Sequence, residues 1–170
     1  MTHVKKNCLA SLTASTLLLA SPVAPAVGVG ATAPDCALSS LADQQSSHLK
    51  QYKGKVVYVD FWASWCGPCA QSFPFLNKLH QQFKDQGLQI IGVNLDENLD
   101  DAKTFLTKIP AEFAISIDDS KQCAEAFAVE AMPSSYIIDR KGLVQHIHLG
   151  FREGAAEELQ TTIEQLLKAK

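Results

Sequence analysis

Two short segments of the chain, residues 56–61 and 88–95, are almost entirely apolar and rich in β-branched residues. Such runs are typical of strands that are covered on both faces. Three longer segments instead repeat apolar residues at the spacing of one helical face. They predict helices from the Cys66–Cys69 segment to about Gln86, over 99–109 and over 153–168.

Shorter elements fill the rest of the pattern. Residues 36–52 predict a short hairpin or irregular lead that ends in a helical turn, 113–117 a strand and 120–127 a short helix. Residues 135–139 and 143–149 flank an Arg-Lys-Gly turn and predict a hairpin. The order β-α-β-α-β-α-β-β-α predicts an α/β fold, with a mixed central sheet flanked by helices on both faces.

The first 26 residues have the pattern of a secretory signal. Basic residues precede a mostly apolar stretch, and Ala24-Pro25-Ala26 places small residues where a signal peptidase cleaves. An uncleaved membrane anchor is the alternative, although the apolar run is short for a bilayer span. We therefore expect a signal peptide over 1–26, an N-terminal lead-in over 27–34 and one domain over 35–170 that works in the periplasm.

Charge and composition narrow the class of protein. The chain is 46% hydrophobic, which suits a globular core. Its formal net charge is −3 and its Lys and Arg residues are not clustered. Nucleic acid is therefore not expected as a partner, because phosphate binding needs clustered cations.

Five cysteines are present, and Cys8 falls in the predicted signal peptide. If Cys66 and Cys69 are the working pair, Cys36 is left to pair with Cys123. An exported protein meets conditions in which such a bond persists. Two buried free thiols are the alternative, because cysteine packs readily as a small hydrophobic residue.

The segment Cys66-Gly67-Pro68-Cys69 lies where a strand passes into a helix. Unpaired N–H groups and the helix dipole at that position favour a negative sulfur on Cys66, and the thiolate is the attacking species. Cys69 follows one turn later, close enough to form a disulfide. Gly67 allows the turn, and Pro68 fits the first helical turn, where its missing donor costs little. We expect Cys66 as the nucleophile and Cys69 as the resolving thiol.

A zinc site is the alternative interpretation of two cysteines at this spacing. It needs a second ligand pair, and the chain has no second Cys-x-x-Cys. His146 and His148 lie on one face of a predicted strand, but two histidines make an incomplete site. No metal and no cofactor are expected.

The run from Val59 to Cys69 resembles the active-site strand and helix start of thioredoxin. The surrounding segments resemble the exported TlpA/ResA/DsbE-like branch of the thioredoxin-like superfamily; they are 33–35, 53–57, 91–96 and 131–139. The similarity covers nearly the whole chain after the predicted signal. It implies a thioredoxin fold and thiol–disulfide oxidoreductase activity.

The resemblance also implies roles for individual residues. Pro133 is expected to be a cis-proline opposite the cysteines, with the backbone of Met132 offered to an extended substrate segment. Asp60 is expected to be a buried carboxylate beneath Cys69 that helps to move its proton. Such a burial raises the pKa of a carboxyl group, which suits a base near neutrality. The alternative for Asp60 is an Asp at a strand end that caps a neighbouring loop.

Substrate contacts are expected around the nucleophile. Trp65 precedes Cys66 and is the better candidate for a substrate contact at the rim, with Gly67 and Pro68 beside it, whereas Trp62 suits the core. Asp96 and Glu97 end the second buried run and are expected in a solvated loop, with a role near the site as the alternative.

Two departures from the exported branch bear on its chemistry. Ser72 stands where ResA-like members usually carry Glu, and Asp60 where many exported relatives have Asn. Both differences favour ordinary thioredoxin chemistry over tuning for cytochromes.

The function expected from the sequence is an exported dithiol reductase of protein disulfides, in cytochrome c maturation or in copper or cell-envelope thiol maintenance. A membrane thiol carrier is the expected electron donor. A disulfide oxidase or isomerase would use the same residues. A non-enzymatic copper-binding or interaction module is the alternative from another class.

Overall fold

A computed structural model describes residues 27–152 and 154–169. The predicted signal peptide over 1–26 lies outside the described residues. Within the described residues, seven strands form one mixed sheet in the order β2-β1-β5-β4-β3-β6-β7. Their bounds are β1 Ala37–Ser40, β2 Ser46–His48, β3 Val56–Trp62, β4 Leu88–Asn94, β5 Ala114–Ile117, β6 Ser134–Ile138 and β7 Val144–Leu149.

The two apolar runs of the sequence form the centre of this sheet. Strands β3 and β4 pair in parallel from Val56 opposite Leu88 to Trp62 opposite Asn94. Every residue of β3 is buried, as its continuous apolar pattern predicts. Strand β5 pairs in parallel with β4, whereas β6 is antiparallel to β3 and β7 is antiparallel to β6. The predicted mixed sheet is confirmed.

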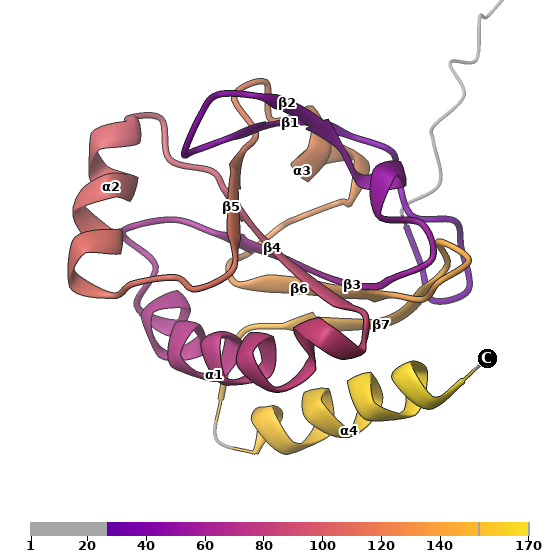
Figure 1. Cartoon of the computed structure of the whole chain (residues 1–170). Helices are drawn as coiled ribbons and strands as arrows, with labels where there is room; N and C mark the ends of the chain where they lie inside the picture. Colours follow the sequence, from indigo (N-terminus) through magenta and orange to yellow (C-terminus); the bar gives the residue numbers. More distant parts are fainter. Residues whose placement is uncertain (1–26, 153, 170) are drawn as a thin grey trace, which may run out of the picture.

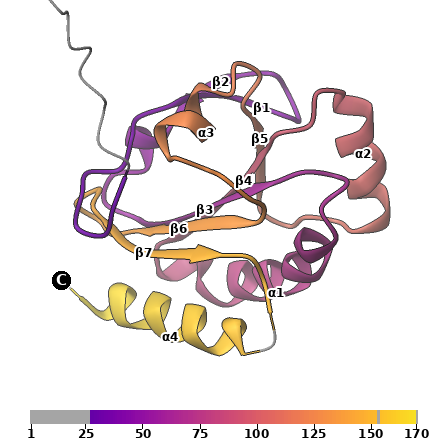
Figure 2. The same cartoon turned by 180° about the vertical axis from the view of Figure 1, so that it is seen from behind.

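Helices cover both faces of the sheet, also as predicted (Figures 1 and 2). Residues of α1, α2 and α4 pack into one core cluster and residues of α3 into a second one. The bounds are α1 Gly67–Phe83, α2 Leu99–Lys108, α3 Gln122–Ala126 and α4 Ala155–Lys168, with single 3₁₀ turns η1 at Leu49–Tyr52 and η2 at Lys84–Gln86. Within the described residues, none of these helices has the length and apolar character needed to cross a membrane.

The crossovers explain why α1 and α2 share a face. The chain passes from β3 through α1 to β4 and from β4 through α2 to β5, stepping twice in the same direction across parallel strands. Because such crossovers are right-handed, both helices lie on the same side of the sheet. The loop from β3 into α1 therefore lies beside α2.

Three aromatic rings fix this corner of the molecule. Trp62 at the end of β3 lies 5.0 Å from Phe73 of α1 and 4.9 Å from Phe105 of α2, measured between ring centroids. The rings of Phe73 and Phe105 are 5.2 Å apart. Trp62 is fully buried. This contact anchors the start of α1, which carries the cysteine pair.

A disulfide joins Cys36, just before β1, to Cys123 of α3, with the two Cα atoms 5.1 Å apart. Both cysteines are buried in the core cluster that faces away from α1. The bridge ties the N-terminal hairpin to the short helix on that face.

Candidate active site

Cys66 is the N-cap residue of α1, and it forms a disulfide with Cys69 whose Cα atoms are 5.3 Å apart. Its backbone is extended, and its sulfur accepts the backbone N–H of Cys69 at 3.2 Å. Cys66 is 5% exposed and Cys69 is fully buried, while Gly67 and Pro68 between them are exposed. The sulfur of Cys66 therefore lies where the free N–H groups at the helix start stabilise a negative charge.

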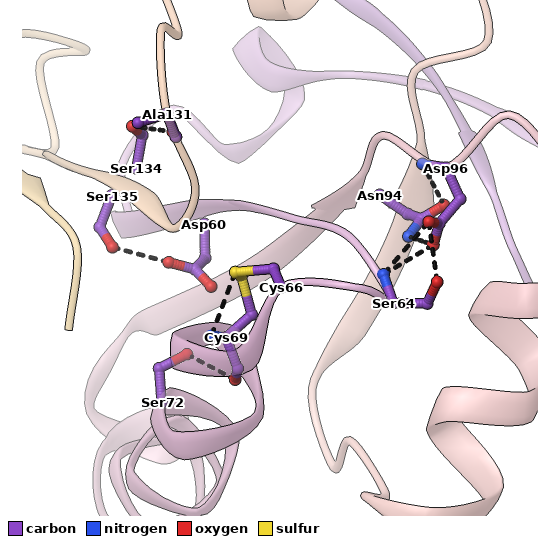
Figure 3. Close-up of a disulfide and its surroundings, with 10 residues drawn as sticks. All are labelled: Asp60, Ser64, Cys66, Cys69, Ser72, Asn94, Asp96, Ala131, Ser134 and Ser135. Atoms are coloured by element: carbon purple, nitrogen blue, oxygen red, sulfur yellow. Dashed lines mark hydrogen bonds between the residues drawn. A yellow bond between two sulfur atoms is a disulfide. The ribbon is translucent and has the colours of Figure 1, made fainter.

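Asp60 lies on β3 and is completely buried. The Ser135 hydroxyl of the neighbouring strand β6 donates to one carboxylate oxygen, Oδ1, at 2.6 Å. The other oxygen, Oδ2, has no hydrogen-bond partner within the described part of the chain. Figure 3 shows this oxygen directed toward the Cys66–Cys69 disulfide. The orientation agrees with a carboxylate beneath the cysteines rather than with a loop cap.

Burial sets the proton affinity of this carboxyl group. Desolvation raises the pKa of Asp60 from 3.8 to about 7, and the hydrogen bond from Ser135 partly offsets that rise. A carboxyl group with a pKa near neutrality exchanges its proton in the pH range in which thiols also react.

The two tryptophans separate as the sequence predicts. Trp65 is 73% exposed, whereas Trp62 is inaccessible to solvent. Beside Trp65 and Cys66, a shallow groove of about 420 Å³ runs along α2. Its α2 side is formed by Asp101, Thr104, Phe105, Lys108 and the adjoining Ile109.

The Met132–Pro133 peptide bond is cis, and it immediately precedes β6. The first residue of β6, Ser134, pairs with Phe61 near the carboxyl end of β3. The cis peptide thus lies at the end of the sheet from which the cysteine loop leaves. Pro133 is buried and Met132 is partly exposed, packed against the core cluster that contains both cysteines.

Asp96 differs from the sequence expectation of a solvated loop residue. It is 5% exposed and accepts hydrogen bonds from the backbone N–H and the hydroxyl of Ser64, both at 2.9 Å. The Asn94 amide donates to it at 2.8 Å (Figure 3). Asp96 therefore fixes the loop that precedes the cysteines. The sequence position of Asp96 just after β4 could have predicted this contact. Neighbouring parallel strands end at the same edge of the sheet, so residues that follow β3 and β4 lie close together.

The remaining polar candidates have local roles. Ser72, at the position of the family's Glu, is buried and donates to the Cys69 carbonyl within α1 at 3.0 Å (Figure 3). His146 and His148 stack on β7 with ring centroids 6.0 Å apart. Among residues 27–152 and 154–169, no three His, Cys, Asp or Glu side chains are grouped to hold a metal ion.

Comparison with known proteins gives a consistent picture. The family model for Redoxin matches residues 28–163. The thiol–disulfide oxidoreductase ResA of Geobacillus thermodenitrificans is 37% identical over 125 residues, which are 74% of this chain and 71% of the relative. The thioredoxin-like protein YneN of Bacillus subtilis is 36% identical over 124 residues, 71% of each chain.

Among solved structures, the chain matches a Chlorobium tepidum protein described as a thiol:disulfide interchange protein, DsbE. The two share 42% sequence identity with a TM-score of 0.79, and the match covers 84% of this chain and 99% of that one. The chain therefore belongs to the Redoxin family, in which it is a thiol–disulfide oxidoreductase of the ResA and DsbE type with a thioredoxin-like fold.

Proposed function

We propose that this protein is an exported dithiol reductase of protein disulfides, with Cys66 as the nucleophile and Cys69 as the resolving thiol. The observation that carries the proposal is the position of Cys66, whose sulfur caps α1 and accepts the Cys69 N–H. A donor that already points at this sulfur stabilises its thiolate, which is the reactive form.

The reaction has two exchange steps. The Cys66 thiolate attacks a substrate disulfide, forms a mixed disulfide and releases one substrate sulfur as a thiolate. Cys69 then loses its proton to Asp60 and attacks the Cys66 sulfur, which releases the second substrate sulfur. The substrate gains two electrons and the enzyme becomes the disulfide that the structure contains. The free oxygen of Asp60, directed toward the cysteine pair, supports its role as the base (Figure 3).

The surface around Cys66 supports a polypeptide substrate. Trp65 offers an exposed apolar face directly beside the nucleophile. Gly67 and Pro68 are exposed at the helix start, and the backbone of Met132 and Pro133 leads into β6 at the same end of the sheet. An extended chain can therefore lie across the helix start and present its disulfide to Cys66.

The residues between the cysteines and the N-terminal segment support the reducing direction and the export of the protein. Thioredoxin, a strong reductant, has the same Gly-Pro pair between its two cysteines. The predicted signal over 1–26 supports export to the periplasm, where a membrane thiol carrier would return electrons to the pair. The relatives named ResA and DsbE carry out thiol–disulfide chemistry by name. The clients that we propose are proteins of cytochrome c maturation, or of copper or cell-envelope thiol maintenance.

Two measurements test this function. In the full chain, Cys69→Ala should accumulate a mixed disulfide between Cys66 and its client in the cell envelope, because the resolving thiol is missing. The matched control is the same variant with Cys66→Ser, which should trap nothing. Equal trapping by both variants would refute Cys66 as the nucleophile.

The direction is tested by equilibrating the dithiol with glutathione. A reductase should have a potential near that of thioredoxin, about −270 mV. A potential near that of DsbA, about −120 mV, would instead make the protein an oxidase.

A further inference from the structure

A row of polar side chains crosses the sheet from the buried Asp60 on β3 to the edge strand β7. In the β3–β6 register Asp60 lies opposite Ser135, and in the β6–β7 register Ser135 lies opposite His148. Residues directly opposite each other in antiparallel strands point to the same face, with Cβ atoms about 5 Å apart. Asp60, Ser135 and His148 therefore form one row on the face that α1 and α4 cover.

Independent contacts place His148 on that face. Ile147, between the two histidines, packs into the core cluster on the opposite side of the sheet. His146 lies 3.9 Å from the carboxylate of Glu158 on α4, measured from Nε2 to Oε1. The rings of His146 and His148 stack with 17° between their planes, so His148 lies on the same face of the sheet as His146.

His148 has an unused nitrogen in this row. Its Nε2 is buried and has no hydrogen-bond partner among residues 27–152 and 154–169, although the residue as a whole is partly exposed. An imidazole that has one buried nitrogen and also reaches the surface can pass a proton between a buried group and water. The Ser135 hydroxyl can relay that proton, because it is both donor and acceptor.

The proposed reaction needs such a route. Asp60 is completely buried, so a proton taken from Cys69 has no direct access to water. We propose that His148 is the proton exit of the active site, which exchanges protons with Asp60 through the hydroxyl of Ser135. This inference rests on the proposed function of Asp60 as the base for Cys69.

One proton moves from Asp60 through Ser135 and His148 to water in each catalytic cycle. After Cys69 has attacked Cys66, Asp60 carries the proton on its carboxyl group. That proton passes to the Ser135 oxygen while the Ser135 hydroxyl proton passes to Nε2 of His148, and the imidazolium then releases a proton to water. During re-reduction of the disulfide the same chain runs inward, in the direction of the observed Ser135-to-Asp60 hydrogen bond.

Charged groups from each neighbouring element act on His148. Burial, His146 on β7 and Arg152 in the following loop lower its pKa, while Glu158 on α4 raises it. Asp60 and Tyr58 on β3 face Ser135 from the other side, and burial and the charge of Asp60 raise the pKa of Tyr58. A neutral His148 near pH 7 is ready to accept a proton from the interior.

The test separates the two exchange steps in the full chain by rapid mixing from pH 5 to pH 9. His148→Ala should leave the first step, attack by Cys66 on a small aromatic disulfide, within twofold of the wild type. The resolving step should slow by about tenfold, because proton transfer by a positioned side chain is worth that much or more. Imidazole at millimolar concentration should restore the resolving rate of this variant.

Two further variants complete the design. His80→Gln is the matched control, because His80 on α1 also has a buried nitrogen that finds no hydrogen-bond partner among the residues the structure describes, and because it lies outside the row. It should resolve at the wild-type rate. Ser135→Ala should slow resolution as His148→Ala does, and the double variant should be no slower than either.

The outcomes are distinct. An unchanged resolving rate and pH profile in His148→Ala, or a loss that imidazole does not restore, would overturn the role of His148. If His148→Ala fails to fold, His148→Gln takes its place and is combined with Ser135→Ala. The double variant should again resolve no more slowly than either single variant. Additive losses in the resolving rate would refute the relay. A wild-type protein without disulfide exchange would instead refute the proposed function itself.

Discussion

Asp60→Asn tests the electrostatics of the site through stability. Burial moves the pKa of Asp60 from 3.8 to about 7. Each tenfold change in proton affinity is about 1.4 kcal/mol, so ionising Asp60 in the folded chain costs about 4 kcal/mol. Asn has nearly the same shape, can still accept the Ser135 hydroxyl and cannot ionise.

The sign follows from which state binds the proton more tightly. The folded chain holds the Asp60 proton more tightly than the unfolded chain, so wild-type stability falls as the pH rises from about 4 through about 7. Above that range the penalty is complete. We therefore expect Asp60→Asn to match the wild type near pH 4 and to exceed its free energy of unfolding by about 4 kcal/mol at pH 8.

Urea denaturation of the oxidised proteins at pH 4, 6 and 8 measures this difference, with the Cys66–Cys69 disulfide intact in both. The oxidised state keeps thiol ionisation out of the comparison. If the two proteins lose stability equally between pH 4 and pH 8, Asp60 is not a buried carboxyl group of raised pKa, and its assignment as the base fails with it.

Three further variants test the framework of the site. Replacing both Cys36 and Cys123 by Ala opens a bridge across 87 residues and should lower the free energy of unfolding by about 4 to 5 kcal/mol; equal stability would mean that the two sulfurs are not bonded in the protein. Asp96→Ala leaves buried donors of the cysteine loop without an acceptor and should cost about 2 to 4 kcal/mol with faster amide exchange in that loop, and unchanged exchange would contradict the anchoring role. Gly92→Ala places a Cβ 2.9 Å from a neighbouring side-chain carbon and should cost about 1 to 3 kcal/mol by denaturation. Gly28→Ala, where no atom of the described residues lies within 4 Å of the added Cβ, is its control and should change stability by less than about 0.5 kcal/mol.

Local chemistry determined the secondary structure and the cysteine pair of the site. Continuous apolar runs predicted β3 and β4, and the Cys-Gly-Pro-Cys segment predicted a cysteine pair at a helix start. These features depend on residues within one turn or one strand of each other. The resemblance to known oxidoreductases added the cis-proline and the importance of Asp60.

Contacts between distant segments were decided only by the tertiary structure. Asp96 was expected in a solvated loop because it follows the end of a buried run, yet the parallel pairing of β3 and β4 buries it against Ser64. The row from Asp60 to His148 depends on two strand registers, which no local pattern in either strand specifies.

The sequence by itself therefore determined which elements form and where the cysteine pair lies, because periodicity and helix capping act over a few residues. Only the packed sheet decided how completely the carboxyl group beneath those sulfurs is buried and which hydrogen-bond partner it has. The proton affinity of Asp60 follows from the complete removal of water around it, and that removal is a property of the whole core.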